Sequence, residues 1–126
     1  MNIDHIATLR IDLATGNVMP LPPPAGENAA SIDGLYWQHG ALIGIQNVTT
    51  PARVVGLALT SEGRKITDVK TLQSHHHRAF GEPTTTAAIV HGALYVLART
   101  QVAQFSDSGT IDRRATLRPP LILRVR

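Results

Sequence analysis

The sequence predicts an all-β fold, organised as a partial β-propeller of about two and a half four-stranded antiparallel blades. Short apolar and β-branched runs are bounded by Gly, Pro and Asn turns along the whole chain. No window of 11 or more residues keeps an unbroken apolar stripe at helical spacing. A strand-and-turn pattern also recurs about every 50 residues, with four strands in each unit. That period and strand number are typical of propeller blades.

About ten strands follow one another in chain order. The first two form a hairpin around the turn Ala14-Thr15-Gly16-Asn17, and Pro22-Pro23-Pro24 ends the second because proline cannot donate to a ladder. Tight turns at His39-Gly40 and over 61–64 join the strands that follow. The expected strands are Ile6–Ile11, Val18–Leu21, Gly34–Gln38, Ala41–Gln46, Arg53–Leu59, Ile66–Leu72, Thr85–Val90, Ala93–Arg99, Gln101–Phe105 and Leu121–Val125.

Two internal repeats decide the architecture. The tetrapeptide His39-Gly40-Ala41-Leu42 recurs 52 residues later as His91-Gly92-Ala93-Leu94, so both copies are expected to be hairpin turns at equivalent places. An alternating strand followed by a polar Gly turn occurs three times, ending at Gly16, Gly63 and Gly109. An immunoglobulin-like sandwich explains the number of strands but not these repeats.

The repeats divide the chain, 1–126, into a half blade over 5–21 and full blades over 32–73 and 85–125. Propellers need at least four blades to close. We therefore expect either self-association or completion by further sequence, and a homo-oligomer follows, most simply a dimer. Two copies would supply five blades by simple addition, provided that the half blades pair across chains. In such an assembly Leu35 and Trp37, which alternate along one strand, are expected to pack between blades.

Composition limits the partners. The 126 residues are 43% hydrophobic and 17% charged, which excludes a disordered chain. We see no apolar run long enough for a membrane span and no signal segment, so no membrane partner and, by default, a cytoplasmic location are expected. The absence of cysteine excludes thiolate sites. Much of the net charge of +3 lies near the C-terminus, on arginines scattered at strand ends. Only 4% of the residues are aromatic, so the composition does not favour nucleic-acid binding.

A family resemblance follows from particular stretches. The stretches are Asp33-Gly34-Leu35-Tyr36-Trp37, 40–47, 53–57, Glu82-Pro83-Thr84-Thr85, 93–96 and 121–125. They resemble the C-terminal blades of six-bladed propellers of the senescence-marker-protein, gluconolactonase and luciferin-regenerating-enzyme-like group. The resemblance covers about residues 5 to 125, which corresponds to less than half of a full family member.

The resemblance implies a metal-dependent hydrolase of the lactonase type acting on a small molecule. Family members hold one divalent cation on oxygen ligands, so Ca²⁺ or Zn²⁺ is the expected cofactor. Asp33 matches a family motif and is the expected metal ligand and catalytic carboxylate. Asn47, by its position after a strand hairpin, and Glu82, three residues before the 52-residue counterpart of Asp33, are further candidate metal ligands. The early-blade Glu ligand of the family has no counterpart in this chain. The alternative is a non-catalytic propeller module for binding or scaffolding, or a fragment whose site has been lost, that self-assembles into a closed ring.

Local structural roles stand beside these assignments. Asp33 precedes Gly34 and could cap a turn through its own backbone, as Asp readily does. The run His75-His76-His77 is eye-catching, but successive residues of an extended chain point to opposite sides. We therefore interpret it as a solvated loop between blades rather than a metal site.

Overall fold

The computed structural model describes residues 7–47, 49, 51–74, 86–111 and 116–125. Nine strands and one short 3-10 helix lie in this part of the chain. The strands are β1 (Leu9–Ile11), β2 (Val18–Pro20), β3 (Ile32–Gln38), β4 (Ala41–Gln46), β5 (Arg53–Leu59), β6 (Ile66–Ser74), β7 (Ala87–Val90), β8 (Ala93–Arg99) and β9 (Leu121–Val125), and the 3-10 helix η1 is Val102–Gln104.

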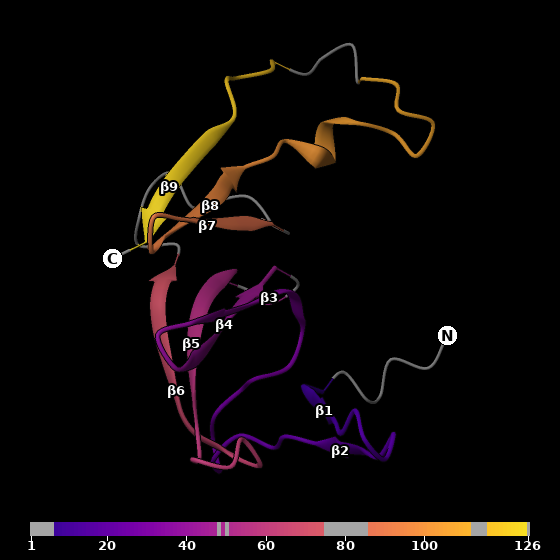
Figure 1. Ribbon diagram of the computed structural model, residues 1–126. Helices are drawn as coiled ribbons and strands as arrows, with labels where there is room; N and C mark the ends of the chain where they lie inside the picture. The colour runs from indigo at the N-terminus through magenta and orange to yellow at the C-terminus, as the bar shows by residue number, and fades with distance from the viewer. Residues whose placement is uncertain (1–6, 48, 50, 75–85, 112–115, 126) are drawn as a thin grey trace.

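The strands form three antiparallel sheets, and the predicted all-β class is confirmed. The first sheet is the hairpin β1-β2, the middle sheet is the meander β3-β4-β5-β6, and the third sheet has the order β7-β8-β9. The sheets follow one another in space as they do along the chain, with the middle sheet between the other two (Figure 1). None of the three sheets closes on itself within the described residues.

The two repeated turns have the same backbone geometry. His39 and Gly40 have φ angles of 48° and 79°, and His91 and Gly92 have 47° and 74°. Positive φ at both central residues is the mark of the type I′ hairpin turn, which matches the right-handed twist of the strands it joins. The two predicted hairpins are therefore confirmed, and β3-β4 is the structural counterpart of β7-β8.

Both faces of the middle sheet are packed, and this positions the other two sheets. On one face, Ile43, Ile45 and Val54 contact Leu94, Val96 and Ala98 of the third sheet. On the other, Val55, Leu57 and Ile66 contact Leu21 and Ala29, from the segment that links the first sheet to the middle one. Strand alternation supplies the two apolar faces, because successive residues of β4 and β5 point to opposite sides of the sheet.

Two hydrogen bonds tie β3 to the third sheet. The Tyr36 hydroxyl accepts the backbone N–H of Ala87 at 2.8 Å. The Gln38 side-chain amide donates to the carbonyl of Gly92 at 2.6 Å. Both bonds come from the face of β3 that meets the third sheet, so they fix how far the two sheets slide along each other.

The third sheet departs from the predicted four strands. The segment Gln101–Phe105, expected to be a strand, instead forms η1 followed by a single bridge from Phe105 to Ile111. Gln101 has a φ of 55°, a left-handed conformation that breaks an extended strand. Its side chain bonds both backbone groups of Arg118, so the chain leaves the sheet and returns (Figure 1). β9 therefore pairs directly with β8.

Leu35 and Trp37 do not make the packing expected of them within this chain. Their side chains are 48% and 60% exposed. They lie on the face of β3 opposite to Tyr36 and Gln38. This face of the middle sheet is turned toward the first sheet, which has only two strands. The β3-β4 half of this face is therefore less covered than the β5-β6 half.

Candidate functional site

Asp33 is the extra residue of a β-bulge at the start of β3. Ile32 is paired with Gln46 and Gly34 with Ile45, so Asp33 has no opposite residue in β4. The preceding Ser31 has a φ of 58°, which turns the chain sharply into the strand. Bulges of this kind leave one residue outside the ladder and re-aim its side chain. The exposed Asp33 carboxylate therefore projects from the end of the sheet.

Asn47 lies beside Asp33. β3 and β4 are antiparallel, so the start of one lies next to the end of the other, and Asn47 follows the last residue of β4. The Asn47 side-chain amide donates to Asp33 Oδ2 at 2.7 Å. Two of the three predicted site residues are thus in direct contact, and the third, Glu82, lies outside the described residues.

The Asp33-Asn47 pair offers oxygen ligands, but few of them. The second carboxylate oxygen of Asp33 and the amide oxygen of Asn47 are of the hard type that Ca²⁺ prefers. Calcium takes six to eight such ligands in proteins. Within the described ranges, no group of three or more His, Asp or Glu side chains could hold a metal ion. The pair therefore fits part of a cation site and does not make a complete one.

A buried glutamine supports this end of the sheet. Gln46 is fully buried, and its amide nitrogen donates to the carbonyls of Asn28 and Ala30 at 3.1 and 2.6 Å. Its side-chain oxygen accepts from Arg53 Nε at 2.6 Å, and the same guanidinium donates to Asn28 at 3.2 Å. These bonds anchor the segment that leads into Ser31 and the bulge, so Gln46 positions Asp33 indirectly.

We did not predict the role of Gln46 from the sequence. The available signal is a polar residue that ends the otherwise apolar strand Ala41–Gln46, followed after a short loop by Arg53 at the start of the next strand. Gln46 and Arg53 are opposite residues in the ladder. Such a pair near a strand end indicates a local polar network, but not which backbone carbonyls it holds.

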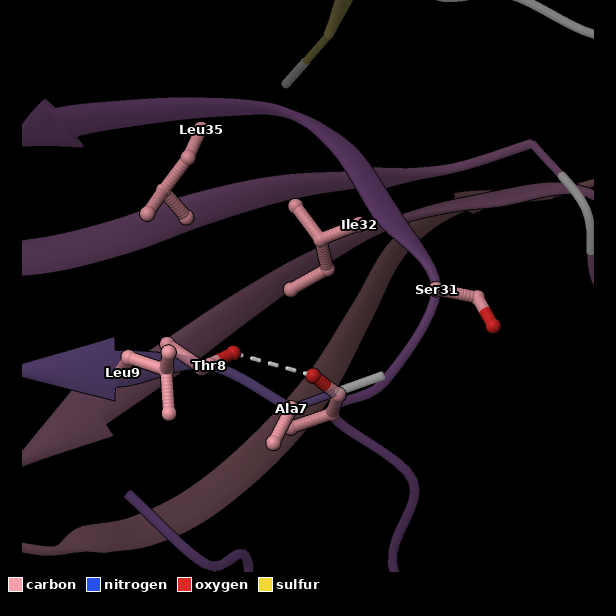
Figure 2. A pocket seen from close by; sticks show the side chains of 7 residues that line it. Ala7, Thr8, Leu9, Ser31, Ile32 and Leu35 are labelled. Atoms are coloured by element: carbon pink, nitrogen blue, oxygen red, sulfur yellow. Dashed lines mark hydrogen bonds between the residues drawn. The ribbon is translucent and has the colours of Figure 1, made fainter. Parts of the chain in front are cut away.

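A small groove lies between β1 and β3 (Figure 2). It has a volume of about 160 Å³ and is lined mostly by apolar side chains, among them Leu9, Ile32 and Leu35. The Thr8 hydroxyl is engaged with the carbonyl of Ala29 at 3.0 Å, and the Ser31 hydroxyl points away from Leu9 and Leu35. The volume is below the 300 Å³ or more typical of cofactor and drug-sized sites. Its chemistry therefore favours apolar side chains as occupants.

The outer face of the third sheet is the other distinctive surface. Ladder partners on this face are Ala88 with Tyr95 and Val90 with Ala93 in β7-β8. In β8-β9 they are Tyr95 with Arg124 and Leu97 with Ile122. Arg124 is the only charged residue among these seven positions, and Arg99 at the end of β8 follows the same alternation at the margin of the face. Solvent-facing sheet surfaces are normally polar, so this face has the composition of a packed one.

The predicted metal site has no histidine contribution in the described part of the chain. His39 and His91 are exposed at their type I′ turns, where histidine tolerates positive φ better than most side chains. The run His75-His76-His77 lies outside the described residues.

Comparison with known proteins adds no relative. No family model, no curated protein and no solved structure matches the chain. A search of the described residues finds no helix of the length and hydropathy needed to cross a bilayer.

Proposed function

We propose that the chain is a non-catalytic assembly module that stacks its sheets with those of a second copy to complete a propeller-like ring. The observation that carries this proposal is the apolar outer face of the third sheet. Val90 and Ile122 on that face are 46% and 64% exposed, and Tyr95 and Leu97 are partly exposed. Contiguous exposed apolar surface on a folded domain marks an interaction site.

The internal repeat supports a sheet as the partner of this face. The 52-residue period relates Ile43 and Ile45 of β4 to Tyr95 and Leu97 of β8. In the middle sheet, Ile43 and Ile45 are buried against the next sheet of the chain. The equivalent residues of the third sheet point the same way, and within the described residues no fourth sheet covers them. The outer face thus repeats a surface whose packing partner in this fold is another antiparallel sheet.

Burial of the outer-face side chains favours association. Full burial of a Val, Leu or Ile side chain contributes about 1.5–3 kcal/mol relative to full exposure. Since Val90, Leu97 and Ile122 are already partly covered, each contributes a fraction of that amount. Several such residues on each of two faces can offset the loss of translational and rotational freedom on binding, about 4–15 kcal/mol.

Sedimentation velocity tests the proposal. The unmodified chain is expected to form a discrete oligomer as its concentration rises. Leu97→Lys, which places a charge at the centre of the outer face, should shift the protein to monomer while far-UV circular dichroism stays unchanged. Thr67→Lys is the matched control, because Thr67 is exposed on β6, away from that face. A folded natural chain that stays monomeric at every concentration would refute the proposal.

A second candidate function is divalent-cation-dependent hydrolysis of the lactonase type. It is supported by the Asp33-Asn47 contact at 2.7 Å on a bulge at the end of the sheet. Asp33 and Asn47 would be the residues of this chain that hold the cation, and a hydrolase cation can polarise a carbonyl oxygen. The two residues supply two of the six or more oxygens that Ca²⁺ needs, so further ligands must come from elsewhere.

Isothermal titration with Ca²⁺, and with Zn²⁺ in parallel, tests this candidate together with a lactone-hydrolysis assay. The candidate predicts cation binding and turnover by the natural chain and loss of both in Asp33→Ala. Turnover that persists in Asp33→Ala would remove Asp33 from any catalytic role. No heat of binding for either cation at millimolar concentration would eliminate the candidate.

A further inference from the structure

We propose that two copies of this chain join their incomplete sheets edge to edge, with β9 of one copy adding to the free edge of β1 of the next. The inference rests on the self-assembly proposed above and names the contact through which it occurs. The result is a composite five-stranded sheet in the order β7-β8-β9-β1-β2. In a ring of two copies, each copy then contributes one complete sheet of its own and parts of two shared sheets.

The strand count of the three sheets motivates the inference. The middle sheet has four strands, whereas the first has two and the third has three. β1 and β9 are edge strands, and within the described residues neither has a strand on its outer side. An open edge leaves backbone N–H and C=O groups unpaired, which makes it a template for adding another strand.

The hydrogen-bond pattern shows which residues of β1 face its open edge. Asp12 N–H donates to Asn17 at 2.9 Å, and the Thr8 carbonyl accepts from Leu21 at 2.8 Å. Bonded positions alternate along an antiparallel strand, so positions 8, 10 and 12 bond to the β2 side. The backbone groups of Leu9 and Ile11 therefore point to the open edge.

The same reasoning identifies the open edge of β9. Leu97 N–H donates to Thr86 at 3.2 Å, so the odd-numbered residues of β8 bond to the β7 side. The even-numbered residues of β8 then bond to β9, where Leu94 is opposite Val125 and Val96 is opposite Leu123. Ile122 and Arg124 are left with backbone groups that point to the open edge.

The side-chain faces agree with this pairing. Leu9 lines the groove together with Leu35 of β3, so Leu9 and Ile11 lie on the face of the first sheet that is turned toward the middle sheet (Figure 2). Ile122 and Arg124 lie on the outer face of the third sheet. Residues that are directly opposite in paired strands share a face. Edge pairing therefore turns the outer face of one third sheet toward the middle sheet of the other copy.

This docking covers both exposed apolar surfaces at once. The third sheet of the partner would lie over the β3-β4 half of the middle sheet, where Leu35 and Trp37 are exposed. Its outer-face side chains Tyr95 and Leu97 would then pack on them. A partner that covered only one of the two surfaces would leave the other in water, so a second copy of this chain is the occupant that the two surfaces favour together.

One antiparallel register matches all three residues of β1 within the five residues of β9. With Ile11 opposite Ile122 and Leu9 opposite Arg124, the three residues of β1 are matched and Arg10 is opposite Leu123. No two charges of like sign are then opposite each other, which would be destabilising. Pro119 and Pro120, which cannot donate to a ladder, fall beyond the end of β1. Two copies joined in this way form four sheets, the smallest number typical of closed propellers.

Directed disulfide formation tests the pairing, and the chain is suited to it because it has no cysteine. Ile11→Cys and Ile122→Cys are prepared as separate chains, one carrying a tag that changes its mass, and are mixed under mild oxidation. Opposite residues in a bonded antiparallel pair have Cα atoms about 5.5 Å apart, within the range that a disulfide spans. We expect a reducible heterodimer band at least about ten times stronger than that from either variant alone.

Leu13→Cys mixed with Ile122→Cys is the matched control. Leu13 lies in the turn after β1 and is 95% exposed, whereas Ile11 is 59% exposed, so random collision would favour the control pair. Equal cross-linking by the two pairs in a protein that sediments as an oligomer would overturn edge pairing and leave self-assembly standing. A monomer in sedimentation would overturn both proposals. Far-UV circular dichroism of each variant checks that the exposed substitutions leave the fold intact.

Discussion

Replacement of Gln46 by leucine should lower the free energy of unfolding, because this one side chain makes three hydrogen bonds in the structure. Gln46→Leu keeps a similar volume but removes the donor to the carbonyls of Asn28 and Ala30 and the acceptor for Arg53 Nε. Asn28 keeps its bond to the Arg53 guanidinium at 3.2 Å, whereas Ala30 loses the side-chain partner shown for it. A buried group left without its partner costs about 1–3 kcal/mol.

The net effect can be worked out from these bonds. The Ala30 carbonyl, which belongs to a half-buried residue, and the Arg53 Nε, which is partly exposed and can turn to water, together contribute about 3 kcal/mol at most. Burial of the added apolar surface offsets about 1 kcal/mol. We therefore expect the free energy of unfolding to fall by about 2 kcal/mol, which shifts the urea midpoint by about 1 M for a domain of this size.

Urea titration followed by far-UV circular dichroism measures this shift at a fixed protein concentration. Gln38→Leu is the matched control, because Gln38 makes one bond near the surface, to Gly92 at 2.6 Å, and should cost about 0.5–1 kcal/mol. If Gln46→Leu is no more destabilising than Gln38→Leu, the buried network does not hold the start of β3 as described.

Two further predictions concern a close approach and a charged turn. Gly44→Ala would bring a Cβ to 2.7 Å from Ile32 Cδ1 and should lower the free energy of unfolding by about 1–3 kcal/mol. In Gly56→Ala the new Cβ would meet its nearest atom at 3.6 Å, so the free energy of unfolding should stay within about 0.5 kcal/mol of the unmodified chain. Thermal melts that show equal destabilisation by the two substitutions would contradict this. Asp12 accepts the backbone N–H groups of Thr15 and Ala14, which lowers the pKa of its carboxyl. Its stabilisation is therefore complete above the unfolded-state pKa and is lost as the pH falls through the lower folded-state pKa. Asp12→Asn should therefore reduce the loss of stability as the pH falls into the acidic range. Thermal melts from neutral to strongly acidic pH in which the melting temperature falls equally in Asp12→Asn and in the unmodified chain would argue against a stabilising role for Asp12.

Local sequence is sufficient for most of the strands and for the repeated turns. Alternation in β4 and β5 predicts their positions, because a period of two puts every second residue on the same face. The His-Gly pairs at 39–40 and 91–92 predict tight hairpins, since glycine adopts positive φ at little cost. These signals act over a few residues, so no knowledge of the rest of the fold is needed to recognise them.

The partner of β9 could not be predicted in the same way. The segment Gln101–Phe105 has the composition of a strand, but its conformation depends on contacts between Gln101 and Arg118, 17 residues apart. Those bonds bring the chain back to β8, and no strand lies between η1 and β9 among the described residues. Long-range contacts of this type override local strand preference, because packing and pairing outweigh the small differences in intrinsic propensity.

The candidate site shows the same division. The sequence singled out Asp33 and Asn47 separately, one through a resemblance and the other through its place after a strand. Their contact follows from antiparallel pairing, which places the start of β3 beside the end of β4, and from the bulge that frees Asp33 from the ladder. The role of Gln46 depends on a segment 16 to 18 residues earlier in the chain.

The sequence by itself determined an all-β chain with an internal repeat of about 50 residues, because alternation and turn residues are local properties. Only the tertiary structure decided how many strands each sheet has and which faces remain uncovered. Whether Leu35, Trp37 and Ile122 are core or surface depends on what lies opposite them, and that is a property of the arrangement of sheets in space. The physical reason is that the composition of a sheet face specifies the need for a partner, whereas the fold determines whether the chain itself supplies it.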